Sequence, residues 1–105
     1  MEAIGILEVY GLTAALVAGD AAAKAARVTI EAIDTNRPKN SDIPIPLVVA
    51  LKIKGSISDV EVALEAGEKA AKKVSDVIVK HIIPRPYEDT NLMIKINRIG
   101  KNKII

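Results

Sequence analysis

Residues 11–26 read GLTAALVAGDAAAKAA, and this alanine-rich stretch decides how the fold begins. The glycine at its start ends the apolar run that precedes it, and Thr13 or Gly11 supplies a candidate cap. The side chains that recur at helical spacing are Leu12, Ala15, Leu16, Ala22, Ala23 and Ala26. We therefore predict a helix over residues 12–26, whose small side chains permit close packing against a sheet or a neighbouring subunit.

Strands are predicted on both sides of this helix. Residues 2–10 alternate in part between apolar and polar side chains and form the first strand. Residues 28–33 form the second, with Val28, Ile30 and Ala32 on one face. Further along the chain, LVVALKIK at 47–54 and DVIVKHII at 76–83 are rich in β-branched residues and form the third and fourth strands.

A second helix is predicted between the third and fourth strands. Residues 58–61 (SDVE) have the form of a capping box, and the helix they open runs to about residue 74. Its predicted apolar stripe consists of Val60, Ala63, Leu64, Gly67, Ala70, Ala71 and Val74. Acids precede lysines along this segment, which matches the helix dipole, and Glu65–Lys69 and Glu68–Lys72 are expected as ion pairs on a solvated face.

The element order is β-α-β-β-α-β, which predicts an α+β fold of the ferredoxin-like split type: a four-stranded antiparallel sheet with two helices on one face. A chain of 105 residues forms one domain. Residues 34–46 are polar and proline-containing, so they are predicted as one long loop. Loops of this length in a compact domain are often functional.

Composition narrows the class of protein. The chain has no cysteine, which excludes disulfides and thiolate metal sites, and neither a signal peptide nor a membrane-spanning stretch is visible. A cytoplasmic protein without a membrane partner is expected. The only aromatic residues are two tyrosines, so nucleic-acid binding is not expected although residues 91–105 carry four basic side chains and no acid. His81 is the only histidine and has no second ligand at metal spacing, so no catalytic residue, metal site or cofactor is predicted.

Half of the residues are apolar, more than a small monomer hides, which favours a large subunit interface. Three segments in order carry a family resemblance: GLTAA with AGDAAAKAA in the first helix, ALEAG in the second, and VKHIIPRP after it. In these residues the chain resembles the bacterial microcompartment shell proteins of the single-domain hexameric type, which contain a BMC domain. The resemblance assigns residues 2–87 to the shell domain and 88–105 to a C-terminal extension.

The resemblance implies a structural shell protein that forms cyclic homohexamers, which tile edge to edge within a cytoplasmic microcompartment. Its partners would be adjoining hexamers, other shell proteins and enclosed enzymes. Lys24 and Arg85 occupy the positions of the family's hexamer-edge residues, whereas Tyr87 departs from the histidine common there. The pore position is held by the predicted loop, with Arg37, Lys39, Asn40, Ser41 and Asp42.

This loop is the main departure from the family pattern, because it is longer than the usual pore loop and has no glycine. Its small positive balance favours passage of anionic metabolites, but a loop that folds over the opening and plugs it fits the sequence as well. The alternative function is a ferredoxin-like oligomeric protein that binds a small ligand or regulates. Such a protein would hold its ligand with the same loop, although phosphate cradles usually need glycines.

Overall fold

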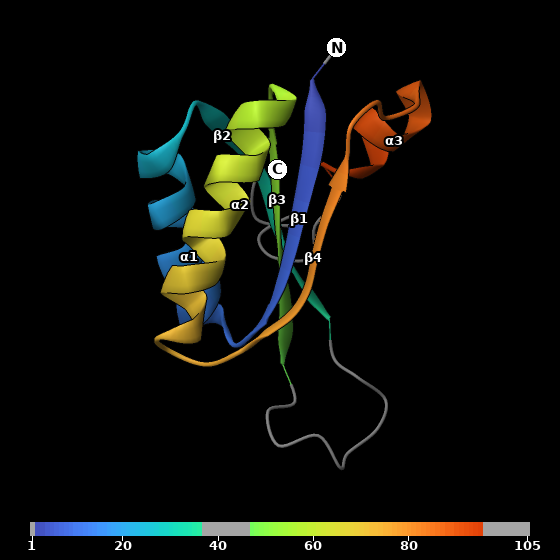
Figure 1. Ribbon diagram of the computed structural model, residues 1–105. Helices are drawn as coiled ribbons and strands as arrows, with labels where there is room; N and C mark the ends of the chain where they lie inside the picture. Colours follow the sequence, from blue (N-terminus) through green and yellow to red (C-terminus); the bar gives the residue numbers. More distant parts are fainter. Residues whose placement is uncertain (1, 37–46, 96–105) are drawn as a thin grey trace.

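The computed structural model describes residues 2–36 and 47–95 of the chain (Figure 1). Its elements are β1 (Ala3–Tyr10), α1 (Leu12–Ala25), β2 (Val28–Asn36), β3 (Val48–Gly55), α2 (Ile57–Lys72), β4 (Val77–Ile83) and α3 (Glu88–Met93). The four strands form one sheet in the order β2-β3-β1-β4, and each neighbouring pair is antiparallel. The predicted ferredoxin-like α+β fold is confirmed.

Two helices cover one face of this sheet. α1 packs over β2 and β3, α2 packs over β1 and β4, and the helices also pack against each other. α3 lies on the opposite side of the sheet (Figure 1). The two edge strands are therefore β2, beneath α1, and β4, beneath α2.

The core lies between the sheet and the two long helices. Its largest fully buried side chains include Leu7, Leu51, Ile53 and Leu64. Small residues let the helices come close to the sheet and to each other. A β-carbon at Gly67 of α2 would lie 3.2 Å from the carbonyl oxygen of Ala18 in α1, so the observed approach leaves no room for a large side chain at this position.

The second strand differs from its prediction in its length and in the sheet face to which its side chains point. It continues to Asn36, so the first residues of the predicted loop belong to the sheet. A bulge lies between Ile30, which pairs with Ile53, and Ala32, which pairs with Lys52. Because a bulge shifts the alternation by one residue, the prediction that Ala32 shares a face with Val28 and Ile30 is wrong. Ile33 packs against the core cluster, and Ala32 is buried at 7% exposure on the other face.

The helix after β3 begins earlier than predicted. Its cap is Ser56, not Ser58: the Ser56 hydroxyl oxygen accepts a hydrogen bond from the backbone N–H of Asp59 at 3.1 Å and donates to the Asp59 carboxylate at 2.9 Å. The local reason is that β3 ends at Gly55, so the next residue already stands at the helix start. The helix also ends at Lys72, which leaves Val74 of the predicted stripe exposed.

Residues after Tyr87 form a short helix, α3, which the sequence did not predict. The sequence left residues 91–99 open between a strand, an amphipathic stretch and a disordered tail. The part of this segment that the structure describes is helical up to Met93. The division into a domain over 2–87 and an extension over 88–105 stays a prediction.

The charged side of α2 makes the predicted pairs and one more. Glu65 lies 3.8 Å from Lys69, and Glu68 lies 3.4 Å from Lys72. In addition, Lys80 of β4 donates a hydrogen bond of 2.9 Å to Glu68, which ties the helix to the edge strand. The Lys80 hydrogen bond, aided by the positive charges of Lys80 and Lys72, lowers the pKa of the Glu68 carboxyl.

We expect Glu68→Gln to lower the free energy of unfolding by about 0.5–1 kcal/mol at neutral pH, as for a partly exposed ion pair. Because the pKa of Glu68 is lowered in the folded protein, this stability is present above its ordinary value of 4.5 and is lost as the pH falls below it. Urea unfolding at neutral and acidic pH should show the difference between parent and variant shrinking in acid. Glu65→Gln is the control, and an equal loss in both variants would contradict the role of Lys80.

Candidate functional site

The predicted pore residues Arg37, Lys39, Asn40, Ser41 and Asp42 lie outside the described residues. The structure does define where their segment starts and ends. Asn36 at the end of β2 pairs with Val48 at the start of β3, so both attachment points lie side by side at one end of the sheet. We call this the loop end.

Lys24 and Arg85 both lie at the opposite end of the sheet, beside its two different edge strands. Lys24 stands in the last turn of α1, shortly before Val28, which pairs with Gly55. Arg85 follows Ile83, the last residue of β4, which pairs with Ile4 near the start of β1. The pairs Val28–Gly55 and Ile83–Ile4 lie at the end of the sheet opposite Asn36 and Val48. We call this second end the outer end.

Lys24 is exposed and forms an ion pair within its own helix. Its ammonium nitrogen lies 2.8 Å from an Asp20 carboxylate oxygen, and this hydrogen bond raises the pKa of Lys24. The amine therefore keeps its positive charge at physiological pH. The prediction did not name Asp20 as a partner, although its spacing of four residues could have revealed it.

Arg85 is exposed next to a buried anchor. Pro86 is fully buried, which fixes the backbone beyond β4, whereas Arg85 and Pro84 line a surface hollow with Ser56 and Ile57 at the start of α2. The Arg85 guanidinium is thus exposed at the outer end, on a segment whose backbone is fixed by the buried Pro86. Sequence reasoning missed Ile57, whose side chain is about half exposed beside it.

One edge of the molecule is apolar along α1 and β2. Leu12, Leu16 and Gly19 follow each other at helical spacing and so share one side of α1. A β-carbon at Gly19 would lie 3.4 Å from Cδ1 of Ile30, which places that side over edge strand β2. The side chains of Leu12, Leu16 and Ile30 are all exposed, and that of Leu16 is 54% exposed. We call Leu12, Leu16 and Ile30 the β2 flank.

The other edge of the sheet has an apolar surface as well. On β4, Glu8 pairs with Val79 and Val9 with Val77, so Ile78 is an extra residue at an irregular point of the edge strand. Ile78 and Val79 are exposed, and so is Val74 after the end of α2. We call Val74, Ile78 and Val79 the β4 flank.

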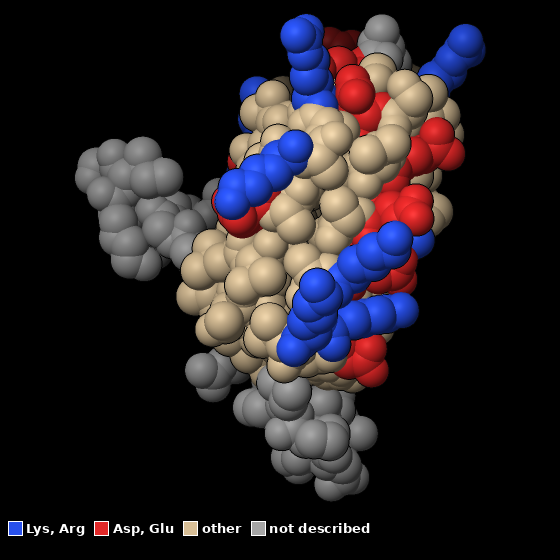
Figure 2. Space-filling model, turned by 60° about the vertical axis from the view of Figure 1, so that its left-hand side comes forward, with Lys and Arg blue, Asp and Glu red and all other residues tan. Residues whose placement is uncertain are grey.

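Charged side chains are unevenly distributed over the helical face of the molecule. Figure 2, which turns the helices toward the reader, shows acidic side chains gathered along one margin and a broad uncharged area beside them. On α2, the acids begin with Asp59 in the first turn and the lysines Lys69 and Lys72 stand in the last turn.

A metal or membrane site finds no support in the described part of the chain. No three His, Cys, Asp or Glu side chains among residues 2–36 and 47–95 are grouped so that they could hold a metal ion. His81 is exposed on the edge strand β4. Within the same residues, no helix has the length and apolar character that crossing a membrane requires.

The fold matches a solved structure. The crystal structure of a microcompartment protein from Desulfitobacterium hafniense DCB superposes with a TM-score of 0.71 at 25% identity and covers 90% of this chain. The chain spans about half of that structure's length, 47%. This likeness places the fold in the class of microcompartment proteins.

The sequence comparisons identify the family. The BMC domain model matches residues 3–86, and the chain belongs to this family. It is 33% identical to the bacterial microcompartment shell protein EutM of Salmonella typhimurium strain LT2 over 99% of this chain and 100% of that protein. It is 38% identical to the shell protein PduA of Citrobacter freundii over 84% of this chain and 86% of that protein.

The resemblance predicted from the three sequence segments is confirmed. The chain is a structural shell protein of the bacterial microcompartment class, with a single BMC domain. The predicted location, a microcompartment shell in the bacterial cytoplasm, follows from the same membership. The roles of Lys24, Arg85 and the five loop residues stay predictions.

Proposed function

We propose that the chain forms cyclic hexamers that join edge to edge into the microcompartment shell, with an opening at the centre of each ring. The observation that carries this proposal is the pair of exposed apolar flanks on the two edge strands of one sheet. A lone chain leaves both flanks in water, whereas a neighbour on each side buries them.

Two different flanks at opposite edges fit a head-to-tail contact. If the β2 flank of one chain packs on the β4 flank of the next, the same contact repeats and closes into a ring. Each chain then makes two identical interfaces and leaves no flank exposed. The family's shell proteins supply the expectation of six chains, and the flanks supply the surfaces that would join them.

The two ends of the sheet fit the two boundaries of such a ring. With the flanks in contact, one end of each sheet points to the axis and the other to the rim. In this proposal the loop end points inward, so Arg37, Lys39, Asn40, Ser41 and Asp42 border the central pore for metabolites. Lys24 and Arg85 then stand at the rim, where adjoining hexamers and other shell proteins meet.

In this proposal the chain is a component of the shell and catalyses no reaction. The relatives that match it are named as shell proteins, which supports a structural role. Enclosed enzymes are further candidate partners on the side of the sheet that faces the interior.

Sedimentation equilibrium tests the hexamer directly. We expect a particle of six times the 11.2 kDa chain mass at micromolar concentration in a mild buffer. Negative-stain images of the same sample should show rings with a central depression. A particle with the mass of one chain under these conditions would refute the proposal.

The rim assignment makes a separate prediction. We expect Lys24→Ala to keep intact rings but to form fewer and smaller two-dimensional arrays, because only contacts between rings are changed. Lys69→Ala is the matched control, since Lys69 is equally exposed at 76% and is likewise paired with an acid in its own helix. Electron micrographs of arrays measure both variants. If Lys24→Ala tiles as well as Lys69→Ala, the rim role of Lys24 is wrong.

A further inference from the structure

A bulge in the edge strand β2 holds an acid that forms no ion pair within the described part of its own chain. Glu31 is the extra residue at this bulge, between Ile30 and Ala32. It is half-buried, and none of the ion pairs among the described residues involves it. Because Glu31 directly follows Ile30, it lies at the edge that carries the β2 flank.

The Glu31 carboxylate requires a positive partner once this edge is buried. Under the proposed function, on which this inference rests, the β2 flank packs against the β4 flank of the next chain. That contact removes water from around Glu31, and a carboxylate that loses its water without a partner is costly. Because no cation among the described residues of its own chain pairs with Glu31, the partner is expected on the next chain.

The β4 edge carries a surplus of positive charge. Lys80 of β4 and Lys72 of α2 pair with the same acid, Glu68, at 2.9 and 3.4 Å. The adjacent pair Glu65–Lys69 is balanced in itself, so two lysines share one carboxylate at this edge. The Lys80 ammonium has three N–H donors, and its side chain is 42% exposed. It can therefore donate to a second carboxylate that comes from another chain.

The register of the sheet places Glu31 and Lys80 at nearly the same level. Neighbours in a cyclic ring are related by rotation about its axis, so atoms that touch across the interface lie equally far from that axis. With the loop end turned inward, this distance runs along the strands. The two rows of paired residues that flank Glu31 are Ile30–Ile53–Gly5–Ile82 and Ala32–Lys52–Ile6–His81. Lys80 follows His81 about 3 Å further along β4, a distance that two long side chains can bridge.

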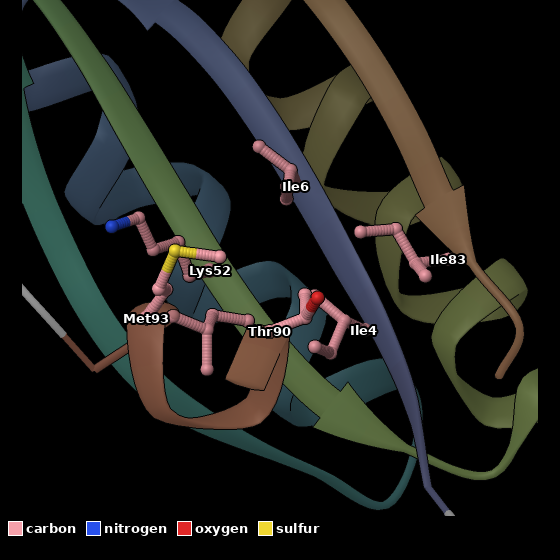
Figure 3. A pocket seen from close by; sticks show the side chains of 7 residues that line it. Ile4, Ile6, Lys52, Ile83, Thr90 and Met93 are labelled. Carbon is pink, nitrogen blue, oxygen red and sulfur yellow. The ribbon is translucent and has the colours of Figure 1, made fainter. Parts of the chain in front are cut away.

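Lys80 and His81 point to opposite faces of the sheet. Ile6 lies on the face that carries α3, where it lines an apolar cavity (Figure 3). His81 pairs with Ile6 and therefore lies on that face as well, whereas Lys80 pairs with Leu7 of the core and lies on the side of α2. Of the two residues, Lys80 is thus the one that belongs to the charged cluster.

We propose that the Glu31 carboxylate of each chain forms an ion pair with the Lys80 ammonium of the next chain in the ring. Each interface then contains two acids, Glu31 and Glu68, and two lysines, Lys72 and Lys80. The pair also selects the neighbour. A shell protein that lacks a cation at this level of its β4 edge would leave Glu31 buried and unpaired, so rings of identical chains are favoured over mixed rings.

A double-mutant cycle in the full-length protein tests the pair. We expect Glu31→Gln and Lys80→Gln each to raise the concentration at which half of the rings dissociate by about tenfold, because each leaves the opposite charge buried alone. The protein with both substitutions should dissociate no more readily than either single variant. Sedimentation velocity over a dilution series measures this concentration, and circular dichroism checks that all variants are folded alike.

Two further variants are the controls. Glu88→Gln removes the same charge from an exposed acid of α3 that belongs to neither flank, and it should leave the rings as stable as those of the parent. His81→Gln changes the other ionisable residue at this level of β4. Any effect of His81→Gln should add to that of Glu31→Gln, because in the proposed interface these two residues do not pair.

Three results would overturn the pair while leaving the hexamer intact. They are rings of parental stability in Glu31→Gln, fully additive effects of Glu31→Gln and Lys80→Gln, and a non-additive effect of Glu31→Gln with His81→Gln instead. A parent protein that forms no rings would refute the hexamer and the pair together. The failure of this ion pair is therefore distinguishable from the failure of the proposed function.

Discussion

Leu16→Asp is expected to leave the protein as single folded chains. Leu16 is 54% exposed on the β2 flank, so the monomer tolerates a charge there. In the proposed ring the same position is buried against a neighbour, where an unpaired carboxylate costs several kcal/mol at every interface. Sedimentation should show the mass of one chain at concentrations where the parent forms rings.

Val62→Asp is the control for this prediction. Val62 is also an apolar helix residue, exposed by 50%, but it lies on the side of α2 turned away from the core and belongs to neither flank. It should keep the ring. Both variants should keep the circular dichroism of the parent. A Leu16→Asp protein that still forms rings would contradict the use of the β2 flank.

A mixture of two variants tests whether the contact is head to tail. Val79→Asp disables the β4 flank, as Leu16→Asp disables the β2 flank. Each chain then keeps the surface that the other has lost. Mixing them should give a pair joined by one intact interface, but no ring. A mixture that stays monomeric would contradict the head-to-tail arrangement. Single variants that each pair through their remaining flank would contradict it as well, because like flanks would then meet.

The second large expected effect is a loss of stability of the single folded chain. Gly67→Leu should lower the free energy of unfolding by about 3 kcal/mol, the upper range for overpacking a well-filled core. A β-carbon at this position would lie 3.2 Å from the Ala18 carbonyl oxygen and 3.4 Å from a Leu7 methyl group. The remaining side-chain atoms would have to separate α1 from α2. Urea unfolding at one fixed protein concentration measures the change.

Gly67→Ala separates bulk from backbone effects. Alanine favours a helix interior over glycine by about 1 kcal/mol, and this gain opposes the cost of the tight contact with α1. We therefore expect a net change near zero for Gly67→Ala and a large loss only for Gly67→Leu. A stable leucine variant would mean that the two helices can move apart without cost, contrary to the close packing observed.

Much of the fold could be predicted from local patterns. The alternation in residues 2–10 and the alanine-rich helix after Gly11 are set by residues close in sequence, and their order gave the ferredoxin-like arrangement. Lys24 and Arg85 could be proposed only because the three resembling segments fix their alignment. No physical property of either residue distinguishes it from an ordinary exposed cation.

Local sequence patterns did not predict the structure where the same pattern is compatible with two local conformations. Ser56 and Ser58 both precede an acid by three residues, so the capping box alone could not locate the start of α2. The bulge in β2 arises from pairing with β3, which no single strand records. Asn91 shows the same limit, because its side-chain oxygen is buried without a partner among residues 2–36 and 47–95, which is a property of the packed α3 and not of the sequence.

The sequence by itself determined the four strands and the two long helices, their order and the family, because helical and strand periods are local and the family segments are contiguous. Only the tertiary structure decided which apolar side chains are core and which are surface. Leu16 and Leu64 are both helical leucines at apolar spacings, yet one is exposed and the other buried. The difference arises because a helix has a single sheet beneath it, and only the position of that sheet determines which side of the helix is removed from water.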